Sequence, residues 1–76
     1  MKPHRIYAGT YREAMDFASA RGWSPSSWTF VRYVESIMEL RYVEVYCVGT
    51  YKDRSDWEFF KERARLQDLF LLHPPH

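Results

Sequence analysis

Two segments of the chain share one short pattern, and this repeat restricts the fold more than any other feature. Tyr7-Ala8-Gly9-Thr10-Tyr11-Arg12 resembles Cys47-Val48-Gly49-Thr50-Tyr51-Lys52, and each lies between residues typical of a strand and residues typical of a helix. Two copies are too few for a solenoid. The repeat predicts two strand-turn-helix units, and in a parallel sheet both Gly-Thr turns would lie at its carboxyl edge.

The first helix has clear signals at both ends. Thr10 and Glu13 match the S/T-x-x-E capping box, in which the Thr10 hydroxyl accepts from the backbone N–H near Glu13 and the Glu13 carboxylate reaches back. Apolar residues then recur at helical spacing, which predicts a helix over residues 11–21. Gly22 follows where a residue in the left-handed conformation commonly ends a helix.

The last helix is expected over residues 56–71. It begins at Ser55-Asp56-Trp57-Glu58, a second match to the capping box. His73-Pro74-Pro75-His76 cannot continue a helix, so we expect a frayed tail over residues 73–76. The rest of the chain, residues 1–72, is expected to form a single domain.

Three strands are expected, over residues 5–8, 28–34 and 42–48, because aromatic and β-branched residues dominate them. With a short turn over residues 35–41, the order is strand, helix, strand, short turn, strand, helix. A strand-helix-strand unit favours a parallel crossover, which predicts an α/β fold with a small three-stranded, mainly parallel sheet and its first strand central. The alternative is a mixed α+β sheet in which the second and third strands form an antiparallel hairpin, because the short turn is brief for a crossover.

Composition argues against several functional classes. The net charge of +1 over 76 residues is low for a mainly electrostatic nucleic-acid binder. A single cysteine excludes an internal disulfide framework, and the histidines lie near the ends of the chain, so we expect no metal site and no cofactor. No apolar run approaches the length of a membrane span and no signal peptide is evident. These features predict a cytoplasmic protein without a membrane partner.

No catalytic group stands out. Cys47 lies in an apolar strand, where a buried thiol is expected rather than a nucleophile. Asp56 and Glu58 suit the first turn of a helix, where negative charge is favourable. Because no general acid and base can be paired, we expect that the protein is not an enzyme.

The last predicted helix has two apolar stripes on roughly opposite sides. One stripe consists of Trp57, Phe60, Ala64 and Leu71. The other consists of Phe59, Leu66, Leu69 and Phe70. A small domain covers one side of such a helix, and burying each large apolar side chain is worth about 1.5–3 kcal/mol. The second stripe therefore predicts the interface of a twofold homodimer, the alternative being a compact monomer that encloses the helix.

The Gly-Thr turns suggest a different class of function, the binding of a nucleotide or phosphate ligand. Backbone N–H groups at such turns attract anions, although the chain contains neither G-x-x-x-x-G-K-[ST] nor G-x-G-x-x-G. The candidate residues are Gly9, Thr10, Arg12, Gly49, Thr50, Lys52 and Arg54. A last alternative is single-stranded nucleic acid stacked on tyrosines. Its candidate cations are Arg12, Arg32, Arg41, Lys52 and Arg54.

Residues 5–14, 20–23 and 28–31 resemble small accessory proteins encoded by bacteriophages, and residues 43–50 resemble the third strand of those proteins. Those phage proteins often show a strand, a Gly-Thr or Gly-Arg turn, an Ala-rich helix, an Ala-Arg-x-Gly segment and then a Trp-containing strand. The resemblance implies a minimal Rossmann-like or P-loop-like unit without assigned catalytic residues, and this chain lacks the Walker lysine. It also implies a non-enzymatic interaction protein that binds or inhibits a bacterial host or phage protein in the host cytoplasm.

Overall fold

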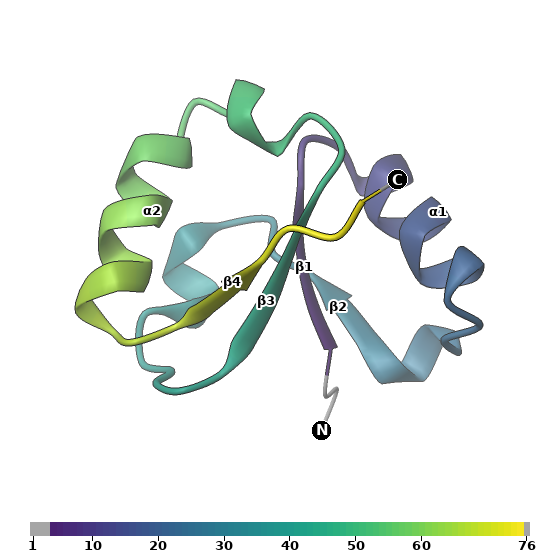
Figure 1. Ribbon diagram of the computed structural model, residues 1–76, viewed down its shortest axis with the longest axis horizontal. Helices are drawn as coiled ribbons and strands as arrows, with labels where there is room; N and C mark the ends of the chain where they lie inside the picture. Colours follow the sequence, from purple (N-terminus) through teal and green to yellow (C-terminus); the bar gives the residue numbers. More distant parts are fainter. Residues whose placement is uncertain (1–3, 76) are drawn as a thin grey trace.

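The computed structural model describes residues 4–75 and contains one sheet of four strands, all parallel, between two helices (Figure 1). The strands are β1 (His4–Ala8), β2 (Trp28–Phe30), β3 (Glu44–Val48) and β4 (Phe70–Leu72). The helices are α1 (Tyr11–Ala20) and α2 (Trp57–Leu66). Short 3₁₀ turns are η1 (Pro25–Ser27), η2 (Val34–Ile37) and η3 (Tyr51–Asp53). The prediction of a small α/β domain is confirmed.

The sheet separates two apolar layers. α1 covers one face and α2 covers the other, with η2 beside α2 (Figure 1). Successive residues of a strand point to opposite faces, so Ile6 and Ala8 of β1 lie in the α1 layer while Tyr7 lies in the α2 layer. The buried residues of the α2 layer are Tyr7, Val31, Val34, Ile37, Val45, Cys47, Phe60, Ala64 and Leu69.

The predicted sheet is wrong in its number of strands and in its order. The observed order is β2-β1-β3-β4, and the sequence analysis missed β4. β1 is an inner strand, as expected, because β2 and β3 both pair with it. The antiparallel hairpin is also wrong, since β2 and β3 are not neighbours. One 3₁₀ turn, η2, makes the second crossover by burying Val34 and Ile37 in the α2 layer.

The two helices end in the same way, with different residues in the left-handed conformation. After α1, Gly22 has φ +72° and the Trp23 N–H donates to the Ala18 carbonyl at 3.0 Å. After α2, Asp68 has φ +57° and the Leu69 N–H donates to the Ala64 carbonyl at 2.9 Å. Both are Schellman motifs, in which aspartate is less usual than glycine.

The helix predicted over residues 56–71 is therefore too long. α2 stops at Leu66, and the chain after Asp68 forms β4. Its predicted capping box is also wrong, because α2 has Asp56 at its N-cap position and no side-chain hydrogen bond there. The first capping box is confirmed.

Two strands are shorter than predicted, and the tail lies against the domain. β2 ends at Phe30, and β3 begins at Glu44 because Tyr42 takes φ +59°, outside the extended range.

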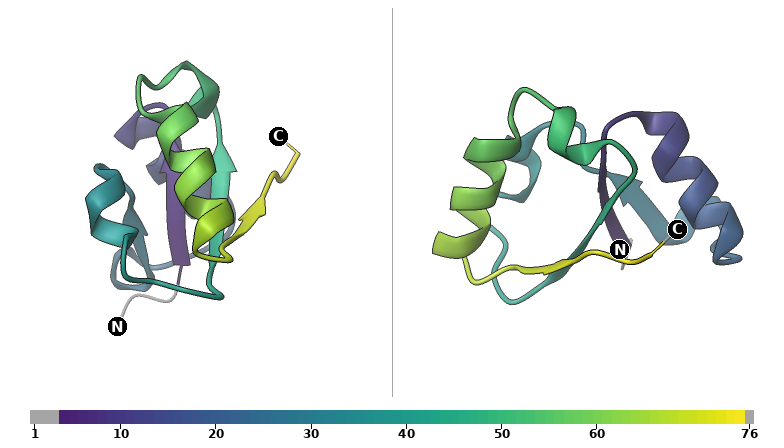
Figure 2. Two further views of the ribbon diagram at one scale, coloured as in Figure 1. Left: turned by 90° about the vertical axis from the view of Figure 1, so that its left-hand side faces the viewer. Right: turned by 45° about the horizontal axis from the view of Figure 1, so that its top comes forward.

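From β4 the tail runs towards α1 (Figure 2), and His73 forms a hydrogen bond with Tyr51. His76, the end of the predicted tail, lies outside the described residues. No helix among residues 4–75 has the length and apolar character needed to cross a bilayer.

Candidate functional site

A single carboxylate joins the two Gly-Thr turns at the carboxyl edge of the sheet. Glu13 Oε1 accepts from the Thr10 N–H at 3.0 Å and from the Thr50 hydroxyl at 2.9 Å. Glu13 Oε2 accepts from the Thr50 N–H at 3.1 Å. The Thr10 hydroxyl accepts in turn from the Glu13 N–H at 3.1 Å, which completes the capping box. The same glutamate therefore caps α1 and ties β1 to β3, and we call this arrangement the Glu13 clasp.

Glycine is required on both sides of the Glu13 clasp. A Cβ atom on Gly9 would lie 2.0 Å from the Thr50 hydroxyl oxygen and 2.7 Å from the Thr50 carbonyl. A Cβ atom on Gly49 would lie 2.5 Å from the Glu13 carboxyl carbon, and Gly49 also has φ +61°. The two glycines thus let the turns approach closely enough to share one carboxylate.

The Glu13 clasp favours the charged form of the carboxyl group. Partial burial acts to raise the pKa of Glu13, but hydrogen bonds from Thr50 and Thr10 outweigh it and hold the pKa below its ordinary value. The turns therefore surround a negative charge that the chain itself supplies. This charge lies between β1 and β3, where the strand order reverses and open parallel sheets commonly bind ligands.

The structure brings together four of the seven predicted phosphate-binding residues, namely Gly9, Thr10, Gly49 and Thr50. The backbone N–H groups of Thr10 and Thr50 already donate to Glu13, and the charge of Glu13 would repel a phosphate. Arg12 instead pairs with Asp16 at 3.3 Å on the exposed side of α1. The Lys52 ammonium lies 5.9 Å from the centre of the Tyr51 ring.

Arg54, the seventh residue, is enclosed by bonds within the protein. Its guanidinium lies 4.1 Å from the centre of the Tyr7 ring, and its side chain is 12% exposed. Two bonds of 3.0 and 2.9 Å reach Asp56. The other three reach the carbonyls of Ala8 at 3.1 Å, Val31 at 2.7 Å and Arg32 at 2.7 Å. These bonds use all five N–H donors of a guanidinium.

Tyr7 completes the arrangement around Arg54. The Tyr7 hydroxyl donates to Asp56 Oδ1 at 2.5 Å. Burial is the largest cause that raises the pKa of Tyr7 well above its ordinary value, and the hydrogen bond to Asp56 is the second. The nearby positive charge of Arg54 acts on the pKa in the opposite direction. Tyr7 is therefore a neutral donor in the core. Sequence reasoning missed this role, because no local motif links residues 49 positions apart.

Three of the four predicted interface residues are exposed. Phe59 and Leu66 are 51% and 49% exposed on α2, and Phe70 is 54% exposed on β4. Leu69 is buried in the α2 layer, because the Schellman motif turns it inward. The stripe facing the sheet is confirmed for Phe60 and Ala64, which are buried on α2.

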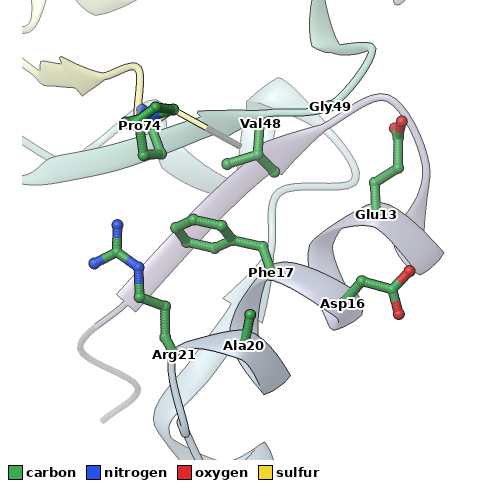
Figure 3. A pocket seen from close by; sticks show the side chains of 9 residues that line it. Glu13, Asp16, Phe17, Ala20, Arg21, Val48, Gly49 and Pro74 are labelled. Carbon is green, nitrogen blue, oxygen red and sulfur yellow. The ribbon is translucent and has the colours of Figure 1, made fainter.

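An apolar groove runs between α1 and the tail (Figure 3). Phe17 and Ala20 of α1 face Val48 and Pro74 across a volume of about 510 Å³. The Arg21 guanidinium lies 4.8 Å from the centre of the Phe17 ring at one end of the groove. The groove offers apolar contact, with opposite charges at its two ends.

No family model, curated protein or solved structure matches this chain. Within residues 4–75, no group of three His, Cys, Asp or Glu side chains is placed to hold a metal ion. The resemblance to phage accessory proteins stays a prediction.

Replacing Glu13 with glutamine tests the charge in the clasp. We expect Glu13→Gln to lower the free energy of unfolding by about 1 kcal/mol at pH 7, because glutamine accepts fewer of these bonds. The lowered pKa of Glu13 means that its stabilisation is present above the unfolded value of about 4.3 and is lost as pH falls through the folded value. Urea unfolding at pH 7 and pH 3 checks this, with the exposed Glu39→Gln as control. If Glu13→Gln lowered the free energy of unfolding by the same amount at pH 7 and at pH 3, the result would contradict a charged Glu13 in the clasp.

Replacing Arg54 with lysine tests the five-bond arrangement. A lysine keeps the charge but cannot reach three carbonyls and a carboxylate together. We expect Arg54→Lys to cost about 3 kcal/mol in urea unfolding. Arg12→Lys, which alters an exposed pair, should change the free energy by less than about 0.5 kcal/mol. Equal effects of the two variants would show that Arg54 is an ordinary surface residue.

Proposed function

We propose that this protein is a non-enzymatic interaction module that forms a homodimer through the edge of β4. The proposal is supported above all by Phe70, a large apolar side chain that stays half exposed on an edge strand. Half-exposure of one phenylalanine forgoes about 1 kcal/mol relative to burial. A second copy of the chain would recover that free energy.

The composition of β4 supports pairing between two copies. Edge strands commonly carry charged residues or proline that prevent association, whereas β4 consists of Phe70, Leu71 and Leu72. Its inner side pairs with β3 and, among residues 4–75, no strand pairs with its outer side. Two β4 strands related by a twofold axis would run antiparallel and join their sheets. Pro74 and Pro75 would end that pairing.

The burial of Cys47 supports a function without covalent catalysis at this thiol. Cys47 is buried on β3, and burial raises the pKa of its thiol to about 12. A reactive thiol needs a lowered pKa and access to solvent.

The outside partner would be a bacterial host or phage protein, which rests on the resemblance to phage accessory proteins. Phe59 and Leu66 are seven residues apart on α2 and share its outer side. This second exposed apolar surface lies on α2 and is available for such a partner.

The dimer is tested by Phe70→Asp. We expect the wild type to sediment as a dimer at micromolar concentration and Phe70→Asp as a monomer, because the dimer would then have to desolvate an unpaired carboxylate in an apolar interface. Tyr33→Asp, at an exposed aromatic outside the strands, should stay dimeric. Circular dichroism would show that all three proteins are folded. A wild-type monomer, or a Phe70→Asp dimer, would contradict the proposal.

A further inference from the structure

We infer that a basic, aromatic hollow beside β4 binds a nucleotide unit, with its base against aromatic rings and its phosphate between two lysines. The basic hollow has a volume of about 620 Å³ and is lined by Tyr51, Lys52, Trp57, Lys61, Leu71 and His73. This volume lies within the usual range for small-ligand sites. The basic hollow is distinct from the Glu13 clasp, which already holds a carboxylate, and the inference does not depend on the proposed dimer.

Three elements and the tail form the basic hollow. Tyr51 and Lys52 belong to η3, Trp57 and Lys61 to α2, and Leu71 to β4. His73 lies in the tail that directly follows β4. η3 leads into the start of α2 (Figures 1 and 2). The hydrogen bond between Tyr51 and His73 links η3 to the tail that follows β4.

Contacts between the walls hold the aromatic rings in place. The Tyr51 hydroxyl and His73 Nδ1 are 2.8 Å apart and share a hydrogen bond. The Tyr51 and Trp57 rings meet edge to face with centres 5.1 Å apart. Trp57 is also anchored towards the core by Phe60, at 6.2 Å between ring centres. Rings fixed in this way offer a surface for a planar ligand at little conformational cost.

The charges that line the basic hollow are positive. The Lys52 ammonium lies 5.9 Å from the centre of the Tyr51 ring, and the Lys61 ammonium lies 5.5 Å from that of Trp57. Among the described residues, no carboxylate lines the basic hollow. Glu58 bonds to Lys61 at 3.1 Å from outside, with a side chain that is 80% exposed. A phosphate could replace this solvated partner and accept from both lysines.

Aromatic rings together with lysines fit a nucleotide better than an acidic peptide. Every base has a flat face that stacks on tyrosine or tryptophan, and its phosphate supplies the negative charge. An acidic peptide would use the lysines and leave the rings without a partner. The nucleotide unit could be free or part of a single strand, since both present the same base and phosphate.

The test compares binding of AMP, adenosine, inorganic phosphate, an eight-residue oligothymidylate and an oligoglutamate by isothermal titration calorimetry of the full chain. We expect AMP to bind more tightly than adenosine or phosphate alone, and oligoglutamate to bind at least about tenfold more weakly than AMP. Tighter binding of oligothymidylate than AMP would assign the site to single strands, and the reverse order would assign it to free nucleotides; either supports the inference.

Matched charge variants locate the site. Lys52→Gln combined with Lys61→Gln should weaken binding of the better nucleotide ligand by about tenfold or more. Arg12→Gln combined with Arg41→Gln removes the same charge from exposed positions outside the basic hollow and should leave binding within about twofold. Absence of nucleotide binding, equal weakening in both double variants, or equal affinity for oligoglutamate would overturn the inference. All four substitutions are at exposed side chains, and circular dichroism would verify their folding.

Discussion

The carboxyl edge of this sheet depends on the hydrogen bonds that the Glu13 carboxylate accepts from both turns. Two turns that end neighbouring parallel strands bring backbone N–H groups together, and these donors need an acceptor. Glu13 supplies it from the first turn of α1, with bonds to both Thr10 and Thr50. Arg54 does the converse on the α2 side, because its guanidinium satisfies the carbonyls at the ends of β1 and β2. At one edge of the sheet, a negative side chain thus accepts hydrogen bonds from backbone N–H groups, and a positive side chain donates hydrogen bonds to backbone carbonyls.

Because side chains of the protein itself already bond to these backbone groups, the proposed binding surfaces lie elsewhere on the molecule. In many parallel sheets the crevice at the switch point receives a ligand phosphate, but here Glu13 lies against the donors that such a phosphate would use. The exposed apolar side chain of Phe70 and the lysine-lined hollow both lie by β4, at the far edge of the sheet from β2. The strand absent from the predicted fold therefore carries the proposed dimer contact and borders the proposed ligand site.

Short sequence motifs correctly predicted the structural features that depend on residues close in sequence. The first capping box gave the correct start of α1, and Gly22 gave its end to within one residue, because the residues that form each cap are close in sequence. The end of α2 was missed because Asp68, rather than glycine, adopts the left-handed conformation, and everything after it changes from helix to strand. The bond from Thr50 to Glu13 spans 37 positions and depends on β1 lying beside β3. The sequence brought both threonines to the candidate site but did not indicate that a glutamate would fill it.

A double-mutant cycle between Glu13→Ala and Thr50→Val tests the Glu13 clasp most directly. Valine keeps the shape of Thr50 and removes only its hydroxyl, whose oxygen lies 2.9 Å from the glutamate. If one carboxylate fastens both turns, the two changes should be non-additive in urea unfolding at pH 7, with a coupling free energy of about 1 kcal/mol. Effects that add to within about 0.3 kcal/mol would contradict a clasp in which the Thr50 hydroxyl helps Glu13 to join the two strands.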